Sequence, residues 1–289
     1  MISNESHQTI AGTIAKTIPV TDSPQTGQLI AVMGGKGGVG KTNIATNLAI
    51  ASAGLQARVL LVDGDLGLAN VDVLLGLTPR CTAAEIVAGD CNFEDALLKG
   101  PGGIHVIPSA SARMDLASSR PAQLTRFLAS LLTAGHQYDL IIVDIGSGVS
   151  APVLSLASVC DRALLVTTPE PTSVADAYGT LKVVRRVAPS LPVELLVNVA
   201  RDELQALATH RQLEQVGERF LGHRIPMRGF LTRDPRLEEA VFAQRAVVEA
   251  FPTAPVSRQL THLAAELLSE VHRPTPPLPR GNQWRRIPS

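Results

Sequence analysis

Residues Gly35–Thr42 are the segment of this 289-residue chain whose types and spacing most clearly indicate chemistry. Their sequence, Gly-Lys-Gly-Gly-Val-Gly-Lys-Thr, matches the pattern G-x-x-x-x-G-K-[ST], with an apolar run before it and a helical pattern after it. Glycines let successive backbone N–H groups point at phosphate oxygens, and the following helix adds partial positive charge at its N-terminus. The segment is therefore predicted to be a P-loop that holds the phosphates of a nucleotide.

The side chains of the loop have separate expected tasks. Lys41 should reach the β- and γ-phosphates, and the Thr42 hydroxyl should ligate Mg²⁺. The sequence contains no [NT]-K-x-D motif for guanine, which favours ATP over GTP. The residues expected to bind ATP or ADP in this segment are Gly35, Lys36, Gly37, Gly38, Val39, Gly40, Lys41, Thr42 and Asn43.

Three carboxylates follow apolar runs that look like buried strands. Asp63 and Asp65 follow the run Val59–Val62, and their i, i+2 spacing places them on the same face of the strand end. Asp144 ends the apolar run Leu140–Val143, which is a Walker B pattern, and is expected to hold Mg²⁺ through water. Strand carboxyl ends line the ligand crevice of an open α/β sheet, so these groups should meet the P-loop there.

Alternating strand and helix patterns must position these groups. The predicted strands are Leu29–Met33, Val59–Val62, His105–Ile107, Leu140–Val143, Ala163–Thr167 and Val193–Val197. The predicted helices include Asn43–Ala53, Gln123–Thr133, Ser173–Val187 and Arg211–Phe220. This order favours the α/β class, with a single doubly wound, mostly parallel sheet and helices on both faces. We expect one domain over 28–272, between a flexible segment 1–27 and a Pro/Arg-rich disordered tail 273–289.

Composition narrows the function classes. Lys and Arg total 26, as do Asp and Glu, so the chain has no global basic charge that would point to nucleic acid. No run of 18 apolar residues is present, and we expect a cytoplasmic protein without a membrane-spanning helix. Cys81, Cys91 and Cys160 form no CxxC pair. They are expected to be small apolar fillers and not a zinc site, an iron–sulfur site or a disulfide framework.

The P-loop sequence resembles the signature of MinD/ParA-type (deviant Walker A) ATPases, which belong to the SIMIBI type of P-loop NTPases. The resemblance implies a dimer that sandwiches ATP, with Lys36 crossing to the partner's nucleotide. It also implies that Asp65 positions the attacking water and that Asp63 supports the Mg²⁺ site without binding the ion directly. Lys36, Lys41 and Asp65 are thus the expected catalytic residues, and Thr42, Asp63 and Asp144 the expected metal residues.

Three further positions follow from the same resemblance. Gly148 is expected to form the turn that senses the γ-phosphate. Asn198, in the segment Val197–Arg201, is expected to contact the adenine edge with its amide, which can both donate and accept. Pro226 is expected to place backbone against the base.

The stretch Asp65–Leu77 resembles the MinD group more than plasmid-type ParA, and the stretch Val166–Tyr178 is similar to the FlhG/FleN branch of this family, also called YlxH or MinD-like. The resemblance covers roughly 28–265. It implies an ATP-dependent monomer/dimer switch, formally a slow ATP hydrolase, that regulates flagellar number and placement. Expected partners are a second copy of the chain, an FlhF-type GTPase, flagellar C-ring proteins and a FleQ-type transcription activator.

Other functions stay open beside this one. A ParA-type partitioning ATPase would use a basic surface for DNA, whereas we expect no direct contact with nucleic acid. A MinD-type division-site selector would use a C-terminal lipid-binding helix. The segment Leu260–Leu268 has helical spacing but lacks a lysine-rich face, so we favour a helix packed on the domain. Peripheral contact with the inner face of the membrane or the cell pole remains an alternative.

Overall fold

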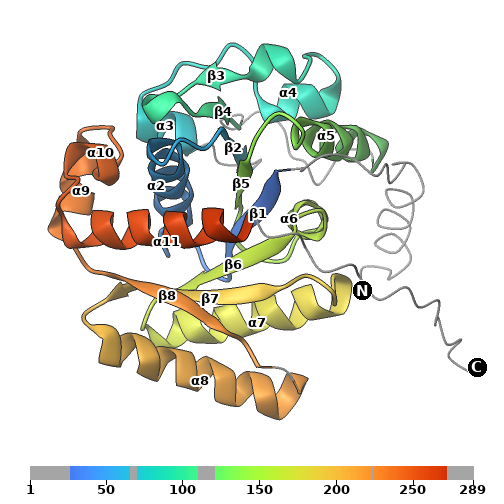
Figure 1. Cartoon of the computed structure of the whole chain (residues 1–289). Helices are drawn as coiled ribbons and strands as arrows, with labels where there is room; N and C mark the ends of the chain where they lie inside the picture. Colours follow the sequence, from blue (N-terminus) through green and yellow to red (C-terminus); the bar gives the residue numbers. More distant parts are fainter. Residues whose placement is uncertain (1–26, 66–69, 110–120, 223, 272–289) are drawn as a thin grey trace, which may run out of the picture.

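The computed structural model describes residues 27–65, 70–109, 121–222 and 224–271. One eight-stranded sheet forms the centre, in the order β3-β4-β2-β5-β1-β6-β7-β8 (Figure 1). The strands are β1 (Gln28–Gly34), β2 (Val59–Gly64), β3 (Leu98–Lys99), β4 (His105–Ile107), β5 (Leu140–Ile145), β6 (Arg162–Thr167), β7 (Val193–Ala200) and β8 (Met227–Thr232). Only the pairing of β3 with β4 is antiparallel, so the predicted mostly parallel sheet is confirmed.

Helices cover both faces of the sheet, as predicted (Figure 1). One face carries α2 (Lys41–Gly54), α3 (Val71–Leu75), α9 (Pro235–Phe242), α10 (Val247–Ala250) and α11 (Pro255–Val271). The other carries α4 (Ala83–Ala88), α5 (Pro121–Ala134), α6 (Ala151–Ser158), α7 (Pro171–Val187) and α8 (Glu203–Leu221). Two short 3₁₀ turns, η1 (Glu94–Ala96) and η2 (Pro101–Gly103), complete the elements. The central strands are buried on both faces because their side chains are apolar at nearly every position.

The register brings the predicted site residues to one edge. Asp63 on β2 lies beside Asp144 on β5, and Asp144 lies beside Val32 on β1. The P-loop leaves the carboxyl end of β1 directly after Gly34 and leads into α2. The topology therefore collects the loop and the acidic residues at the carboxyl ends of three adjacent strands, where an open α/β sheet binds its ligands.

The structure contains two strands and one disulfide that the sequence patterns did not predict. β3 has only two residues, and β8 mixes Arg228, Gly229 and other half-buried residues, so neither shows a strong apolar run. Cys81 and Cys91 are joined by a disulfide, which corrects the prediction that all three cysteines are fillers. Cys160 is a buried free thiol.

The terminal predictions fare differently. The segments 1–26 and 272–289, which contain most of the predicted lead-in and the whole predicted tail, lie outside the described residues. The predicted C-terminal helix is α11, and its apolar stripe is buried against the domain. None of the helices in the described ranges is long and apolar enough to cross a membrane.

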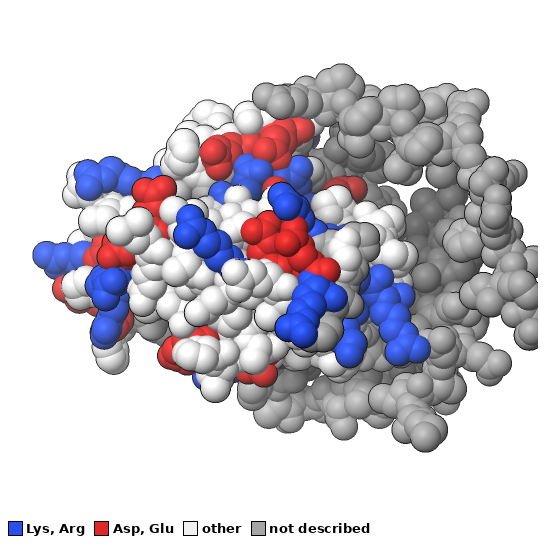
Figure 2. Space-filling model, turned by 90° about the horizontal axis from the view of Figure 1, so that it is seen from below, with Lys and Arg blue, Asp and Glu red and all other residues white. Residues whose placement is uncertain are grey.

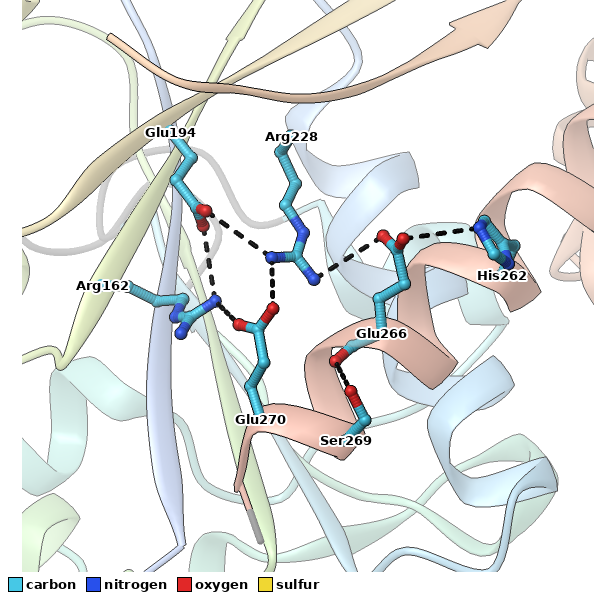
Figure 3. A network of polar contacts seen from close by, with 7 residues as sticks. All are labelled: Arg162, Glu194, Arg228, His262, Glu266, Ser269 and Glu270. Carbon is cyan, nitrogen blue, oxygen red and sulfur yellow. Dashed lines mark hydrogen bonds and ion pairs between the residues drawn. The ribbon is translucent and has the colours of Figure 1, made fainter. Parts of the chain in front are cut away.

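A network of charged residues fastens α11 to the sheet (Figure 3). Arg228 on β8 pairs with Glu270 at 2.8 Å, Glu194 at 3.5 Å and Glu266 at 3.6 Å. Arg162 on β6 pairs with Glu194 and also with Glu270. The side chain of Arg228 is only 9% exposed, and its neighbouring carboxylates raise its pKa against the opposing effect of burial. Arg228 is therefore the most buried member of this network, and it pairs with all three of its glutamates.

We predict that Arg228→Ala lowers the free energy of unfolding by roughly 1–3 kcal/mol, because it removes a largely buried guanidinium that pairs with three partly exposed carboxylates, two of which keep Arg162 as a partner. Urea unfolding followed by circular dichroism measures the change. Arg224→Ala is the matched control, because Arg224 pairs with Glu218 while its side chain is 80% exposed, so that its loss should matter little. Equal losses in the two variants would contradict the central place of Arg228.

Candidate functional site

A cleft of about 520 Å³ opens at the carboxyl ends of the strands. The P-loop and the start of α2 form one wall. Asp65, α3, the turn after β5 and the end of α9 form the others. The lining residues are Gly37, Gly38, Gly40, Lys41, Thr42, Asn43, Asp65, Asn70, Val73, Leu74, Ser147, Val241 and Gln244. The cleft thus gathers the predicted phosphate loop and a carboxylate in one space.

The backbone of the P-loop is open where a ligand would lie. Gly38 and Gly40 have φ values of 80° and 92°, in the left-handed region that glycine adopts without strain. A Cβ atom added at Gly37 or Gly38 would meet no atom within 4 Å. The N-terminus of α2, a helix of 14 residues, begins directly after Gly40. This arrangement presents backbone N–H groups and a helix N-terminus to an anion.

The two ends of the P-loop pack closely against α7 and β7. A Cβ at Gly35 would lie 2.1 Å from the Asp176 carbonyl oxygen of α7, so only glycine permits this approach. At Gly40 a Cβ would lie 2.4 Å from Nδ2 of Asn198. That Nδ2 donates a 2.8 Å hydrogen bond to the Val39 carbonyl. The loop is therefore fixed against α7 and β7 while its centre stays free.

Asp144 is the buried group best suited to hold a cation. Its side chain is 1% exposed, and neither carboxylate oxygen has a hydrogen-bond partner among the described residues. Burial raises the pKa of Asp144 to about 6, while the nearby Thr42 hydroxyl and the Lys41 charge act in the opposite direction. A buried carboxylate without partners is costly unless a cation or proton satisfies it. With Thr42, it offers oxygen atoms of the kind that Mg²⁺ prefers.

Asp63 organises the backbone that follows β2. Its Oδ1 accepts the Asp65 N–H at 3.1 Å, and its Oδ2 accepts the N–H groups of Asn70 and Val71 at 3.1 and 3.2 Å. Burial and the neighbouring Asp144 raise the pKa of Asp63 to about 7, although these backbone donors oppose the rise. Because its oxygens bind backbone N–H groups, Asp63 acts on the site by holding Asp65 and α3 in place.

Asp65 lies against the turn that follows β5. Its carboxyl carbon is 3.2 Å from the position of a Cβ built on Gly146, so a larger residue there would displace it. The Asp65 carbonyl accepts a 2.9 Å hydrogen bond from the buried Ser109 hydroxyl. Gly148, with a φ of 91°, donates its N–H to the Gly34 carbonyl at 3.4 Å. The predicted sensing turn therefore contacts both the predicted catalytic carboxylate and the start of the P-loop.

Lys36 lies apart from the cleft lining. Its Nζ is 3.2 Å from a Glu170 oxygen and 3.4 Å from the Thr172 hydroxyl, at the start of α7. The Lys36 side chain is 43% exposed. Its charge is thus held at the surface, and Lys36 is not among the residues that line the cleft.

The two predicted base-binding residues lie in different places. Asn198 is buried at the carboxyl end of β7, beside Val199, whose φ of 58° is strained for a β-branched residue. Pro226 precedes β8, and its carbonyl accepts the Leu195 N–H near the opposite edge of the sheet. The prediction that Pro226 contacts the base is therefore wrong, because β8 runs parallel to β7 and Pro226 precedes its amino-terminal end, whereas the P-loop lies at the carboxyl ends of the strands.

Sequence patterns also missed one wall of the cleft. Val73 and Leu74 of α3 face Val241 and Gln244 at the end of α9. Gln244 has a φ of 51° and donates its side-chain N–H to the Val73 carbonyl at 2.8 Å. No sequence motif predicts this contact, because its partners are 171 residues apart in the sequence.

The donors fit a nucleotide with Mg²⁺. The open loop backbone and Lys41 would hold the phosphates, and Thr42 with Asp144 would hold the metal. Bound Mg²⁺ would neutralise the charge that develops on the transferred phosphoryl group. Asp65 has the position from which a carboxylate could orient a water molecule toward that group. These residue roles are predictions.

We predict that Asp144→Asn stabilises the nucleotide-free protein at about pH 8 by about 1 kcal/mol or more. The pKa values of Asp63 and Asp144 are raised on folding, so their contribution to stability is complete below about pH 4. That contribution is lost as pH rises through the raised pKa values of about 6 and about 7. Removing the Asp144 charge should therefore make the loss of stability with rising pH less steep. Urea unfolding between about pH 5 and pH 8, in the presence of a chelator, measures it. The exposed Asp90→Asn is the control, and a steeper decline in Asp144→Asn would contradict the prediction.

Comparisons with known proteins agree with this geometry. The family model ParA, described as an NUBPL iron-transfer P-loop NTPase, matches residues 25–268. The antiactivator FleN of Pseudomonas aeruginosa is 40% identical over 255 residues, which cover 88% of this chain and 90% of FleN. The flagellum site-determining protein YlxH of Helicobacter pylori is 26% identical, covering 84% of this chain and 83% of YlxH.

A solved structure shows the same fold with a ligand. The septum site-determining protein MinD of Pyrococcus horikoshii, complexed with Mg-ADP, has a TM-score of 0.71 and 25% identity. The match covers 83% of this chain and 95% of that one. From the P-loop, the sheet order and these matches together, the chain belongs to the ParA/MinD family of P-loop ATPases.

Proposed function

We propose that this protein is an ATP-dependent monomer/dimer switch that regulates flagellar number and placement. The observation that carries the proposal is the 40% identity to the antiactivator FleN over nearly the whole of both chains. The similarity to the flagellum site-determining protein YlxH points to the same process. ATP hydrolysis would serve as a slow timer, which returns the dimer to monomers.

The chemistry of the timer would follow from the site. Lys41 and the loop backbone bind the phosphates, and Thr42 and Asp144 bind Mg²⁺. Asp65, fixed by the Asp63 and Ser109 hydrogen bonds, orients the attacking water in line with the γ-phosphate. Asn198 holds the P-loop through Val39 and is proposed to contact the adenine edge as well.

Two observations support a dimer formed at the nucleotide edge. Lys36 is exposed and contributes nothing to its own cleft, so a second copy's phosphates are a suitable partner. The exposed large apolar residues at the carboxyl edge of the sheet are Val73, Val149, Val199, Leu204 and Phe242. Phe242 is 90% exposed at the end of α9, beside the cleft. Apolar residues gathered at one edge are typical of an interaction surface.

The alternatives are a MinD-type division-site selector and a ParA-type partitioning ATPase. Non-specific DNA binding relies on a continuous basic surface. The face of α7 and α8 instead carries acidic and basic side chains side by side (Figure 2). α11 packs on the domain through its apolar stripe and the Arg228 network, which gives the lipid-binding alternative no support from this helix.

Partners and location follow from the proposed process. A FleQ-type transcription activator is the partner that an antiactivator requires. An FlhF-type GTPase and flagellar C-ring proteins are the further candidates. A cytoplasmic protein that gathers at the membrane or the cell pole would meet all three.

The proposed process is tested by deleting the gene and counting flagella per cell by electron microscopy. We expect excess or misplaced flagella, restored to normal by the wild-type gene and not by an Asp65→Ala copy, which cannot reset the timer. Normal flagella with minicells or chromosome loss would instead support a division or partitioning role.

The proposed dimer is tested with Lys36→Ala. We expect ATP-induced dimerisation to weaken by about tenfold or more, because a charge that crosses the interface is lost. ATP affinity should change much less. Light scattering and nucleotide titration measure the two effects, with Lys182→Ala, an exposed lysine of α7, as the matched control. Equal losses of dimerisation and ATP binding would contradict a role for Lys36 across the interface.

A further inference from the structure

The disulfide between Cys81 and Cys91 encloses the short helix α4. The two Cα atoms are 6.5 Å apart, within the range that a disulfide spans. Cys81 is buried at 7% exposure, whereas Cys91 is half-buried and can meet a small thiol or disulfide from solution. Access of this kind is what thiol–disulfide exchange requires.

α4 does not depend on this bond for its structure. The Glu85 side chain accepts the Thr82 N–H at 2.8 Å, and the Thr82 side chain accepts the Glu85 N–H, so that the two residues form a capping box. Gly89 ends the helix in the left-handed conformation, and Ile86 and Val87 are buried in the core. The bond can therefore open without unfolding the helix, a condition for reversible use.

The enclosed segment is connected to Asp65 by two hydrogen bonds. The Ala83 N–H donates to the Pro108 carbonyl at 2.8 Å. The next residue, Ser109, donates its hydroxyl to the Asp65 carbonyl at 2.9 Å, and Ser109 is 1% exposed. These two hydrogen bonds connect the segment that follows Cys81 to the backbone of Asp65 through the end of β4.

We propose that Cys81 and Cys91 form a reversible disulfide, and that the disulfide-bonded form holds Asp65 in position for hydrolysis. The oxidant is a small-molecule disulfide of the glutathione type. The Cys91 thiolate attacks one of its sulfurs, which forms a mixed disulfide and releases one thiol. The Cys81 thiolate then attacks the Cys91 sulfur and releases the second thiol. The two cysteines lose two electrons and two protons, and the small disulfide becomes two thiols.

The bond itself is tested on the full-length protein in glutathione buffers of graded redox potential. After acid quenching, free thiols are alkylated under denaturing conditions, the protein is reduced, and the released thiols are labelled with a second reagent for mass spectrometry. We expect Cys81 and Cys91 to exchange labels together, while Cys160 stays free throughout. Stable glutathione adducts on Cys91 without pairing, or free thiols at every potential, would overturn the proposal.

The coupling to hydrolysis rests on the proposed function and has its own measurements. We expect reduction to lower the ATPase rate roughly threefold or more. Reduction should also lower the melting temperature by roughly 5 °C and speed hydrogen exchange in residues 104–109. Cys91→Ser should behave as the reduced protein in either buffer, and Cys160→Ala should keep the redox response.

These measurements separate the possible failures. If the bond forms and opens but neither the ATPase rate nor the exchange of residues 104–109 changes, the coupling to Asp65 is wrong. If the protein hydrolyses no ATP in either state, the proposed function fails, while labelling and exchange still decide the disulfide and its reach to β4.

Discussion

Two carboxylates buried side by side in the middle of the sheet are the constraint on which the rest of the site depends. Asp63 and Asp144 are adjacent in register, and burial raises the pKa of both. The fold tolerates Asp63 because three backbone N–H groups bind it. It tolerates Asp144 without such partners, at a cost that a bound cation would remove. The region around the two carboxylates is therefore expected to be less stable without a bound cation than with one.

The hydrogen bonds of Asp63 give the carboxylates of Asp63 and Asp144 different roles. One carboxylate keeps its oxygens for the protein backbone and fixes both Asp65 and the start of α3. The other keeps its oxygens free beside Thr42 and Lys41. Under the proposed roles, a sheet with only one of these carboxylates would bind a cation or hold the segment of Asp65 in place, but not both. This division explains why two acidic strand ends meet at one P-loop.

Sequence alone was enough for the central sheet and for the local parts of the site. The P-loop, Asp63, Asp65 and Asp144 follow apolar runs whose length and composition dictate buried parallel strands. What escaped prediction depends on long-range packing. Pro226 was misplaced because the weakly apolar β8 was not recognised, so the direction in which the chain crosses the sheet edge there was unknown. The Gln244 contact with α3 and the pairing of the cysteines likewise depend on tertiary geometry.

In the proposed dimer, the position of Lys36 would make a second copy necessary for hydrolysis. A lysine next to phosphates in its own cleft would stabilise bound ATP and its transition state in the monomer alike. Lys36 is instead paired with Glu170 at the surface, where an exposed ion pair is weak and readily exchanged for a stronger anion. A partner's nucleotide phosphates are such an anion. Hydrolysis would then depend on assembly, because Lys36, the proposed catalytic charge, would arrive only with the partner, and the ATPase would act as a switch.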